Sequence, residues 1–170
     1  MKRRAFTLIE LTLVLLILSI LAASATLRAQ RPLSRARMID VIGQIEHFDH
    51  VTRTAAREQG RAMYTIVDLT AGELRRSDEE GESLEIAPLQ LPRGFSIESV
   101  LVRDNAIYNG RTAISCNRQG AMPTYAILLA GPGMKQWLAF AGITSQMIKL
   151  EDEQQAQEII DATGERGHAG

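Results

Sequence analysis

The feature that most constrains this chain is an apolar run near its start that contains a single charge. Residues 6–27 read FTLIELTLVLLILSILAASATL, and Glu10 is the one charged side chain among them. As a helix, this run would be about 33 Å long at roughly 1.5 Å per residue, which is enough to cross the hydrocarbon core of a membrane. We therefore expect a transmembrane helix over residues 6–27.

Two simpler interpretations of this segment are a cleaved secretory signal peptide and a plain signal anchor. The basic residues Lys2, Arg3 and Arg4 precede the run, as they would in a signal peptide. The run is longer than the usual apolar core of roughly 7–15 residues, which argues against a signal peptide. The orientation of an anchor is not fixed by the positive-inside rule, because basic residues also follow the run, at Arg28, Arg31, Arg35 and Arg37.

Glu10 is the unusual residue of the run. A carboxylate about one turn inside a membrane span costs on the order of 2–3 kcal/mol, so it needs a partner. No Lys, Arg or His lies in the same span, which leaves a free amine or a group on another molecule. The alternative is that the side chain of Glu10 extends to the membrane surface, since it lies only one turn deep.

The stretch from Lys2 to Leu11, KRRAFTLIEL, resembles the N-terminal signal of type IV pilins and pseudopilins. The family pattern is a short basic leader, a small residue, Phe-Thr-Leu-Ile-Glu and a long apolar helix. The resemblance implies that a prepilin peptidase cuts between Ala5 and Phe6 and methylates the new amine of Phe6. It also implies that Glu10 meets this amine on a neighbouring subunit during assembly. The family usually has Gly before the cut, where this chain has Ala5.

Beyond the span, apolar residues recur at spacings of three and four, which predicts an amphipathic continuation of the helix over residues 28–59. Gly60 is the expected stop. We therefore predict one long helix over about residues 7–59, whose second half packs on a globular domain. The predicted core positions of that half are Met38, Ile39, Ile42, Ile45, Phe48, Val51, Ala55 and Ala56.

After Gly60 the hydrophobic period changes to two, which predicts about six to eight short strands within residues 60–150. Turn signals such as Asn109-Gly110 and Gly131-Pro132-Gly133 separate most of them. Pro88 indicates an edge strand. The predicted strands cover residues 62–69, 72–76, 84–91, 95–103, 112–117, 125–130, 136–141 and 144–150, and residues 77–82 read as a solvated acidic loop.

Helix first and strands afterwards, with no βαβ alternation, indicate an α+β fold. We expect a pilin-like architecture, in which a long N-terminal helix with a transmembrane half and an amphipathic half packs on an antiparallel β-sheet. The domain order is then a leader at 1–5, the transmembrane helix at 6–27, the amphipathic helix at 28–59, a β-rich soluble domain at 60–150, and a short helix with a flexible tail at 151–170. The helix is expected over 151–161, and the tail from Thr163.

The element order and the stretch from Ile114 to Gly120, ISCNRQG, are most similar to the GspH/FimT type of minor pseudopilin. A major pseudopilin usually carries an acidic calcium loop near its end. The acidic run Glu151-Asp152-Glu153 reads better as the first turn of a helix, where acids suit the helix dipole.

Residue types and spacings exclude several kinds of active site. The single cysteine, Cys116, rules out an intramolecular disulfide, and we expect a buried, inert thiol. His47 and His50 lie three residues apart, but no third zinc ligand is evident, so a solvated helix face is favoured. No phosphate-binding, dinucleotide-binding or nucleophilic serine motif is present. We therefore expect no catalytic residue, no metal and no cofactor.

The charge balance argues against nucleic acid as a partner. The chain has 19 basic and 20 acidic residues, for a net charge of −1, and loss of the three basic leader residues would make it more acidic. The arginines at positions 28, 31, 35 and 37 favour contact with anionic lipid headgroups over DNA. On the strand that carries Trp137 and Phe140 we expect core packing, and an exposed Trp137 would indicate a partner surface.

The resemblance implies a structural, non-enzymatic minor pseudopilin of a type II protein secretion system. Such a protein sits in the inner membrane as a single-pass protein with its C-terminal domain in the periplasm, and then joins the pseudopilus. The implied partners are other pseudopilins or pilins, prepilin peptidase, an inner-membrane assembly platform and membrane lipid. The alternative is a minor pilin of a type IV pilus, acting in adhesion, motility or DNA uptake. A membrane-anchored enzyme is the third interpretation, and no motif supports it.

Overall fold

In the computed structural model of this protein, the described residues are 8–78, 87–103 and 105–164, apart from the side chains of residues 23–32 and 164. These residues form two compact units, Met1–Met38 and Ile39–Gly170. Helix α1 (Leu8–Gln59) contributes to both units. Its bounds agree with the helix predicted over residues 7–59.

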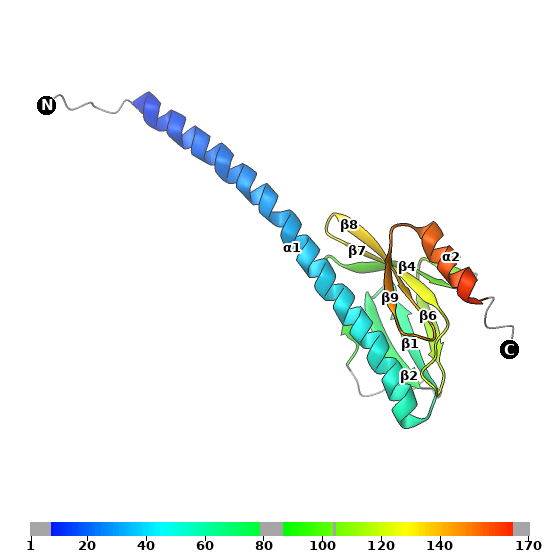
Figure 1. The fold of residues 1–170 in the computed structure, drawn as a ribbon. Coiled ribbons are helices and arrows are strands. Elements are labelled where there is room, and N and C mark those ends of the chain that lie inside the picture. The colour runs from blue at the N-terminus through cyan, green and yellow to red at the C-terminus, as the bar shows by residue number, and fades with distance from the viewer. Residues whose placement is uncertain (1–7, 79–86, 104, 165–170) are drawn as a thin grey trace. The chain divides into compact units, whose positions relative to one another are not determined.

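In the first unit, α1 runs as a helix (Figure 1), and its described apolar side chains from Leu8 to Leu33 are exposed, whereas Met38 is buried. Within the described residues, no helix is both long enough and apolar enough to cross a membrane. The predicted span at residues 6–27 includes positions outside that set, and it stays a prediction.

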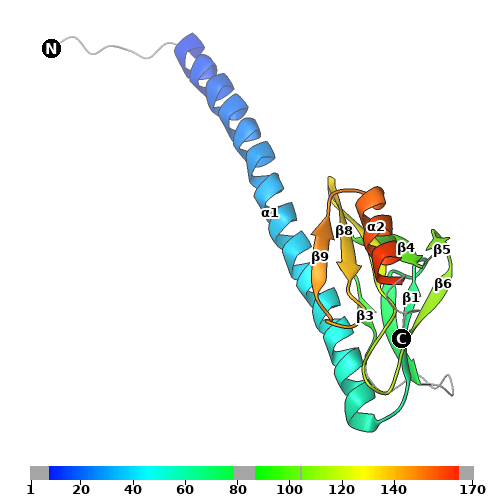
Figure 2. The same ribbon diagram turned by 45° about the vertical axis from the view of Figure 1, so that its right-hand side comes forward.

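In the second unit, α1 is followed by nine strands within the described residues and by a helix at the C-terminal end (Figure 2). The elements are β1 (Met63–Asp68), β2 (Glu73–Asp78), β3 (Leu89–Gln90), β4 (Ser96–Val102), β5 (Asn105–Ile107), β6 (Arg111–Cys116), β7 (Tyr125–Gly131), β8 (Met134–Phe140), β9 (Met147–Leu150) and α2 (Glu153–Gly164).

The strands form two sheets instead of the one that was expected. A four-stranded sheet has the order β3-β2-β1-β6, and a five-stranded sheet has the order β5-β4-β7-β8-β9. Every pairing is antiparallel. The predicted α+β class with antiparallel sheets is therefore confirmed, and β3 lies at a sheet edge, as Pro88 indicated.

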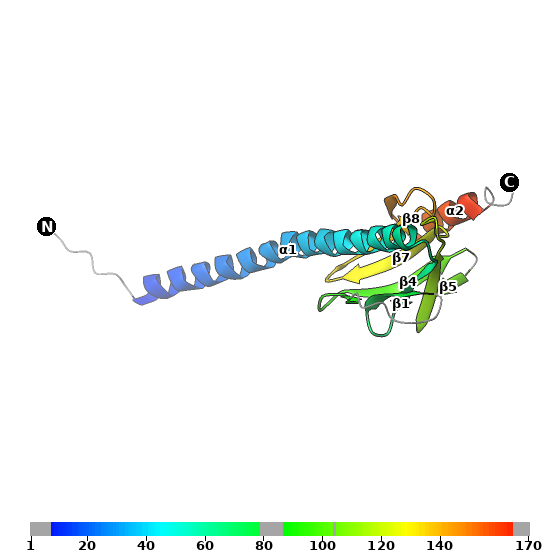
Figure 3. The ribbon, with the colours of Figure 1, turned by 90° about the horizontal axis from the view of Figure 1, so that it is seen from below.

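The main core lies between the second half of α1 and the two sheets (Figure 3). On α1, the apolar positions Ile42, Ile45 and Phe48 are buried, as predicted. Ile39 was predicted to be buried, but its side chain is 55% exposed, whereas Val41 is buried. The actual buried face therefore includes position 41, since positions 41, 45 and 48 follow the helical repeat of three and four residues.

A second core lies on the opposite face of the five-stranded sheet, where α2 covers it. Trp137 and Ala139 of β8 pack there with Ala156 and Ile160 of α2. The side chain of Trp137 is 6% exposed, so the expectation of core packing holds, and Trp137 does not form an exposed partner surface.

Helix α2 begins after an N-cap at Asp152, whose carboxylate accepts a hydrogen bond from the Gln155 backbone N–H at 2.9 Å. In return, the Gln155 side chain accepts a bond from the Glu151 backbone N–H at 3.1 Å. The acidic run therefore starts a helix, as predicted. The helix continues to Gly164, so the prediction that the flexible tail begins at Thr163 was wrong.

The predicted strand limits needed several other corrections. Strand β8 begins at Met134 and β9 at Met147, where starts at 136 and 144 were predicted. Ser77 and Asp78 were assigned to a solvated loop, but they end β2 and are buried. Of the strand predicted over residues 84–91, only Leu89–Gln90 is a strand in the described residues, and residues 84–86 lie outside them. Strand β5 was not predicted, because three residues are too few to show a period of two.

We predict that Gly142→Ala destabilises the protein by about 1–3 kcal/mol, the usual cost of overpacking. A Cβ atom at this position would lie 2.2 Å from the Met122 carbonyl oxygen and 3.0 Å from the Thr124 nitrogen, and both are backbone atoms. Urea unfolding of the full chain in detergent micelles measures the change.

Gly43→Ala is the matched control for this substitution. Gly43 is an exposed position within α1, and a Cβ atom there has no neighbour within 4 Å. Alanine in a helix is favoured over glycine by roughly 0.5–1 kcal/mol, so this variant should gain stability. Equal effects of the two substitutions would contradict the steric explanation.

Candidate functional site

The first candidate site is the N-terminal part of α1, where the described apolar side chains are exposed. Exposed fractions run from 43% at Val14 to 83% at Leu8. The residues from 8 to 22 are exposed on every side of the helix. A helix that is apolar all round needs an apolar environment, either lipid or other helices.

Polar groups in this stretch are satisfied within the helix, with one exception. The Thr12 hydroxyl donates to the Ile9 carbonyl at 2.9 Å, and the Ser19 hydroxyl donates to the Leu16 carbonyl at 2.7 Å. Glu10 lies in the first described turn of α1 and is exposed. It forms no ion pair with any described residue. Ala5 and Phe6, the predicted cleavage and methylation positions, lie outside the described residues.

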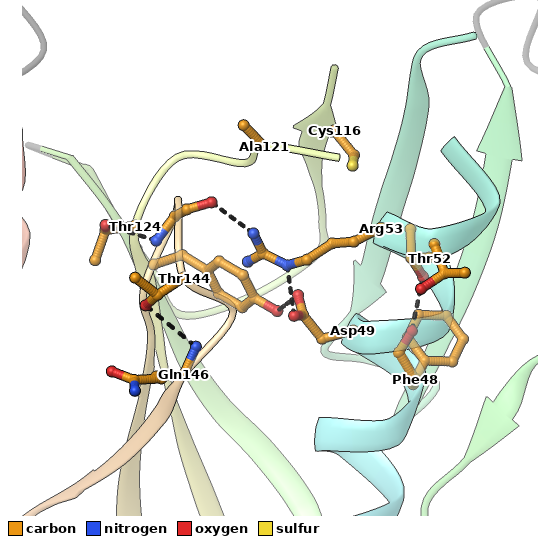
Figure 4. A network of polar contacts seen from close by, with 12 residues as sticks. Phe48, Asp49, Thr52, Arg53, Cys116, Ala121, Thr124, Thr144 and Gln146 are labelled. Atoms are coloured by element: carbon orange, nitrogen blue, oxygen red, sulfur yellow. Dashed lines mark hydrogen bonds and ion pairs between the residues drawn. The ribbon is translucent and has the colours of Figure 1, made fainter. Parts of the chain in front are cut away.

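A second group of polar contacts joins α1 to the five-stranded sheet (Figure 4). The buried side chain of Arg53 donates through Nε to Asp49 Oδ2 at 2.7 Å and through Nη1 to the Gly142 carbonyl at 2.6 Å. The Tyr125 hydroxyl donates to Asp49 Oδ1 at 2.8 Å. We call Asp49, Arg53, Tyr125 and Gly142 the buried polar network. It connects one helical turn of α1 with β7 and the β8–β9 loop.

The environment of the buried polar network raises the pKa of Tyr125 well above its ordinary value. Burial is the main cause, since it disfavours the phenolate, and the nearby carboxylate of Asp49 adds to it. The Tyr125 ring also stacks on Phe140, with ring centroids 4.8 Å apart. Tyr125 is therefore held neutral as a hydrogen-bond donor, which suits a structural role.

Contacts with the four-stranded sheet lie on the adjoining face of the same helical turns. Arg76 of β2 donates through Nε to the Thr52 hydroxyl at 2.8 Å and through Nη2 to the Phe48 carbonyl at 3.2 Å. Its guanidinium carbon lies 4.1 Å from the centroid of the Phe48 ring, within the range of a cation–π contact. Burial lowers the pKa of Arg76. Each sheet is thus fixed to α1 by one arginine.

The stretch singled out at residues 114–120 contains the end of β6 and, from Asn117, a tight turn against α1. The Asn117 side chain accepts hydrogen bonds from the Gln119 and Ala121 backbone N–H groups, at 3.0 and 2.9 Å. Gly120 has φ +76°, and a Cβ atom there would lie 2.8 Å from the Arg53 carbonyl oxygen. Glycine is required at this position by both the backbone conformation and the close approach to α1.

Other residues considered for chemistry do not come together as a site. Cys116 is buried, as predicted, and burial raises the pKa of its thiol, which keeps the reactive thiolate scarce. His47 and His50 are exposed on α1 beside a shallow cavity of about 310 Å³. In the part of the chain that the structure describes, no three His, Cys, Asp or Glu side chains are grouped to hold a metal ion.

The basic residues after the apolar run are described only in part. Arg35 and Arg37 are exposed, while the side chains of Arg28 and Arg31 lie outside the described set.

Sequence analysis did not find the buried polar network. Asp49 and Arg53 are four residues apart and lie on the apolar face of α1, between Ile45 and Ala56. A charged pair at this spacing on a face that is otherwise apolar is the signal that could have revealed it.

Comparison with known proteins agrees with the N-terminal signal. Residues 1–26 match the family described as the prokaryotic N-terminal methylation motif. The chain therefore carries a prepilin-type N-terminus. This match confirms the resemblance drawn from the stretch Lys2 to Leu11. No curated protein matches the chain.

Among solved structures, the chain is similar to the minor pseudopilin EpsH from the type 2 secretion system of Vibrio cholerae. The sequences are 10% identical, the match covers 66% of this chain and 94% of the other, and the TM-score is 0.49. The α+β fold of this chain is established by its own helices and antiparallel sheets.

We predict that Asp49→Ala destabilises the protein by about 3–5 kcal/mol, because it leaves the buried Arg53 guanidinium without its carboxylate. Tyr125→Phe removes one hydrogen bond to a charged group and should cost about 1.5–3 kcal/mol. Urea unfolding of the full chain in detergent measures both. Asp40→Ala, on an exposed face of α1, is the control and should change stability by less than about 0.5 kcal/mol.

We also predict that stability falls as the pH rises above about 10, the ordinary pKa of tyrosine. The unfolded chain then loses the Tyr125 proton while the folded chain retains it, so alkali favours unfolding. Urea unfolding from pH 8 to 11 should show a steeper loss for the natural protein than for Tyr125→Phe. Identical slopes would show that Tyr125 titrates alike in both states.

Proposed function

We propose that this protein is a structural, non-enzymatic minor pseudopilin of a type II protein secretion system. One combined observation carries the proposal. Residues 1–26 match the N-terminal methylation motif, and the helix that follows exposes apolar side chains on every side around a single acid. Such a helix suits storage in lipid followed by transfer into a bundle of similar helices.

Processing creates the partner that Glu10 lacks. Prepilin peptidase cuts between Ala5 and Phe6 and methylates Phe6, which leaves a positively charged amine at the new N-terminus. In a bundle of low dielectric constant, this amine attracts the Glu10 carboxylate of a neighbouring subunit strongly. Pairing also removes the cost of burying either charge alone. Glu10 thereby favours the correct axial position of each added subunit.

The location of the protein follows from the same segment. We infer that the chain crosses the inner membrane once, with its C-terminal domain in the periplasm, before it enters the pseudopilus. Arg35 and Arg37 are exposed on α1 beyond the apolar run, where anionic lipid headgroups would attract them. The partners are other pseudopilins, prepilin peptidase, the assembly platform and membrane lipid.

A minor pilin of a type IV pilus is the alternative, because it carries the same N-terminal motif. Deletion of the gene in its host separates the two functions. Loss of secreted proteins from the medium with surface pili intact supports the secretion role. Loss of pili with normal secretion supports the pilus role.

We predict that Glu10→Ala reduces incorporation into filaments by roughly tenfold or more, the factor that corresponds to about 1.4 kcal/mol of lost pairing energy. Incorporation is measured as the fraction of the chain that is recovered with sheared filaments from the host. The soluble domain should stay folded, since its buried polar network and its second core are formed by residues of the second unit. Mass spectrometry should show that the variant has lost residues 1–5.

Two further variants separate charge from size and position. Glu10→Gln keeps the shape of the side chain and should fail like Glu10→Ala, because the charge is what pairs with the amine. Glu46→Ala removes an exposed acid further along α1 and should assemble normally. Normal incorporation of Glu10→Ala, or a native protein that retains its leader, would refute the proposal.

A further inference from the structure

Strand β6 leaves one edge of the four-stranded sheet without a partner strand in the described residues. An edge strand exposes backbone N–H and C=O groups that can pair with another chain, and proteins usually block such edges. The two sheets have four edge strands, which are β3, β5, β6 and β9. These four edges differ in how well their sequence and length prevent pairing with a strand of another chain.

Three of these edges are poor templates for pairing. Strand β3 has two residues and lies between Pro88 and Pro92, and β5 has three residues. Strand β9 has four residues and carries the exposed Lys149. Strand β6 has six residues, and from Thr112 to Cys116 it contains neither a charge nor a proline. Its edge is the longest and the least blocked.

The pairing register shows which backbone groups of β6 face outward. The Leu69 backbone N–H donates to the Gly110 carbonyl at 3.0 Å, in the same register that pairs Thr65 with Ile114. Alternate residues of an antiparallel pair bond to each other, so Thr112, Ile114 and Cys116 bond to β1. Ala113 and Ser115 therefore direct their N–H and C=O groups to the open side. Both are small and exposed, which leaves these groups accessible.

A cavity of about 520 Å³ adjoins this edge. Its lining includes Ala113 and Ser115 of β6, Val102 of β4, and Met122 and Pro123 from the loop after β6. The lining mixes polar and apolar groups, and its apolar side chains Val102, Met122 and Pro123 would contact an apolar side chain of a bound segment. Figure 2 shows β6 beside β5 at the outer side of the domain, so an added strand could approach it. The volume falls within the roughly 300–1,000 Å³ of ordinary ligand sites.

Arg103 is the one charged residue that lines the cavity, among the residues described there. It lies in the turn between β4 and β5 and is exposed. No described residue forms an ion pair with it. A positive charge at this position favours a negatively charged side chain on whatever occupies the cavity.

We propose that the β6 edge and its cavity bind an extended segment of another protein subunit, which adds as a strand along Ala113 and Ser115 and places an acidic side chain near Arg103. Backbone hydrogen bonds to the edge supply affinity, while the apolar side chains of the mixed lining and the charge of Arg103 select the sequence. This inference concerns the soluble domain and goes beyond the proposed function. Failure of the Glu10 experiment would leave it unaffected.

The test is selection of a random twelve-residue peptide library, displayed on phage, with the full chain in detergent micelles. Peptides that also bind the Ser115→Pro variant are removed. Proline deletes the outward N–H of Ser115 and leaves the bonds to β1 in place, because Ser115 does not bond to β1. The selected peptides should alternate apolar and polar residues and contain Asp or Glu. Circular dichroism checks that the variant is folded.

Two charge variants keep the test decisive if Ser115→Pro does not fold. Arg103→Glu should weaken binding of the selected acidic peptides at least tenfold and should improve binding of the same peptides with Lys in place of the acid. Arg93→Glu, an exposed arginine outside the cavity, should leave binding unchanged. N-methylation of alternate peptide bonds should abolish binding, because it removes the strand pairing.

Three results would overturn the proposal. In the first, every peptide selected with the natural chain also binds the Ser115→Pro variant. In the second, binding is insensitive to both Arg103→Glu and N-methylation. In the third, sedimentation shows a dimer of the full chain that Ser115→Pro abolishes, which would assign the edge to a second copy of this chain.

Discussion

The buried pair of Asp49 and Arg53 is the interaction on which the arrangement of the soluble domain depends. Two charges removed from water are costly unless neighbouring polar groups bind them, and here a tyrosine hydroxyl binds Asp49 and a loop carbonyl binds Arg53, which leaves Arg53 Nη2 as a buried donor without a partner among the described residues. An alternative packing of α1, rotated or shifted by one turn, would bury these charges without partners. Arg76 of the four-stranded sheet is also buried, and it too finds its hydrogen-bond partner on α1, Thr52, only in this position of the helix. We interpret these polar contacts as fixing one position of the helix, whereas the surrounding apolar residues supply most of the stabilisation.

One continuous helix thus serves two environments. Its second half is amphipathic and carries the domain, while its first described turns are apolar all round and exposed, with no described residue packed over them. Glu10 is compatible with the apolar environment around the first turns only if a counter-charge is provided there. Under the proposed function, that charge is the amine that processing would create at Phe6. The stability of the soluble domain and the assembly of the filament can therefore be altered separately.

Local sequence patterns were enough to predict the helix and most strands. The repeat of three and four residues fixed α1, and the turn glycines bounded β4, β7 and β8. Pairing between strands was not predictable in the same way, because the register that brings β6 to β1 joins residues about fifty positions apart, as in Met63 with Cys116. The division into two sheets was missed for this reason. Ile39 was misplaced because a periodic pattern gives a face only to within about one position. Glu10 was found because a charge in an apolar run is conspicuous, whereas Asp49 and Arg53 lay among other charged residues.

The cover that α2 places over β8 has an optical consequence. The chain has one tryptophan, and its indole lies beneath Ala156 and Ile160. Detachment of the C-terminal helix would expose that indole to water while the other core remained closed. Indole emission shifts to longer wavelength in a polar environment, so the natural protein carries an intrinsic reporter for the docking of its last helix.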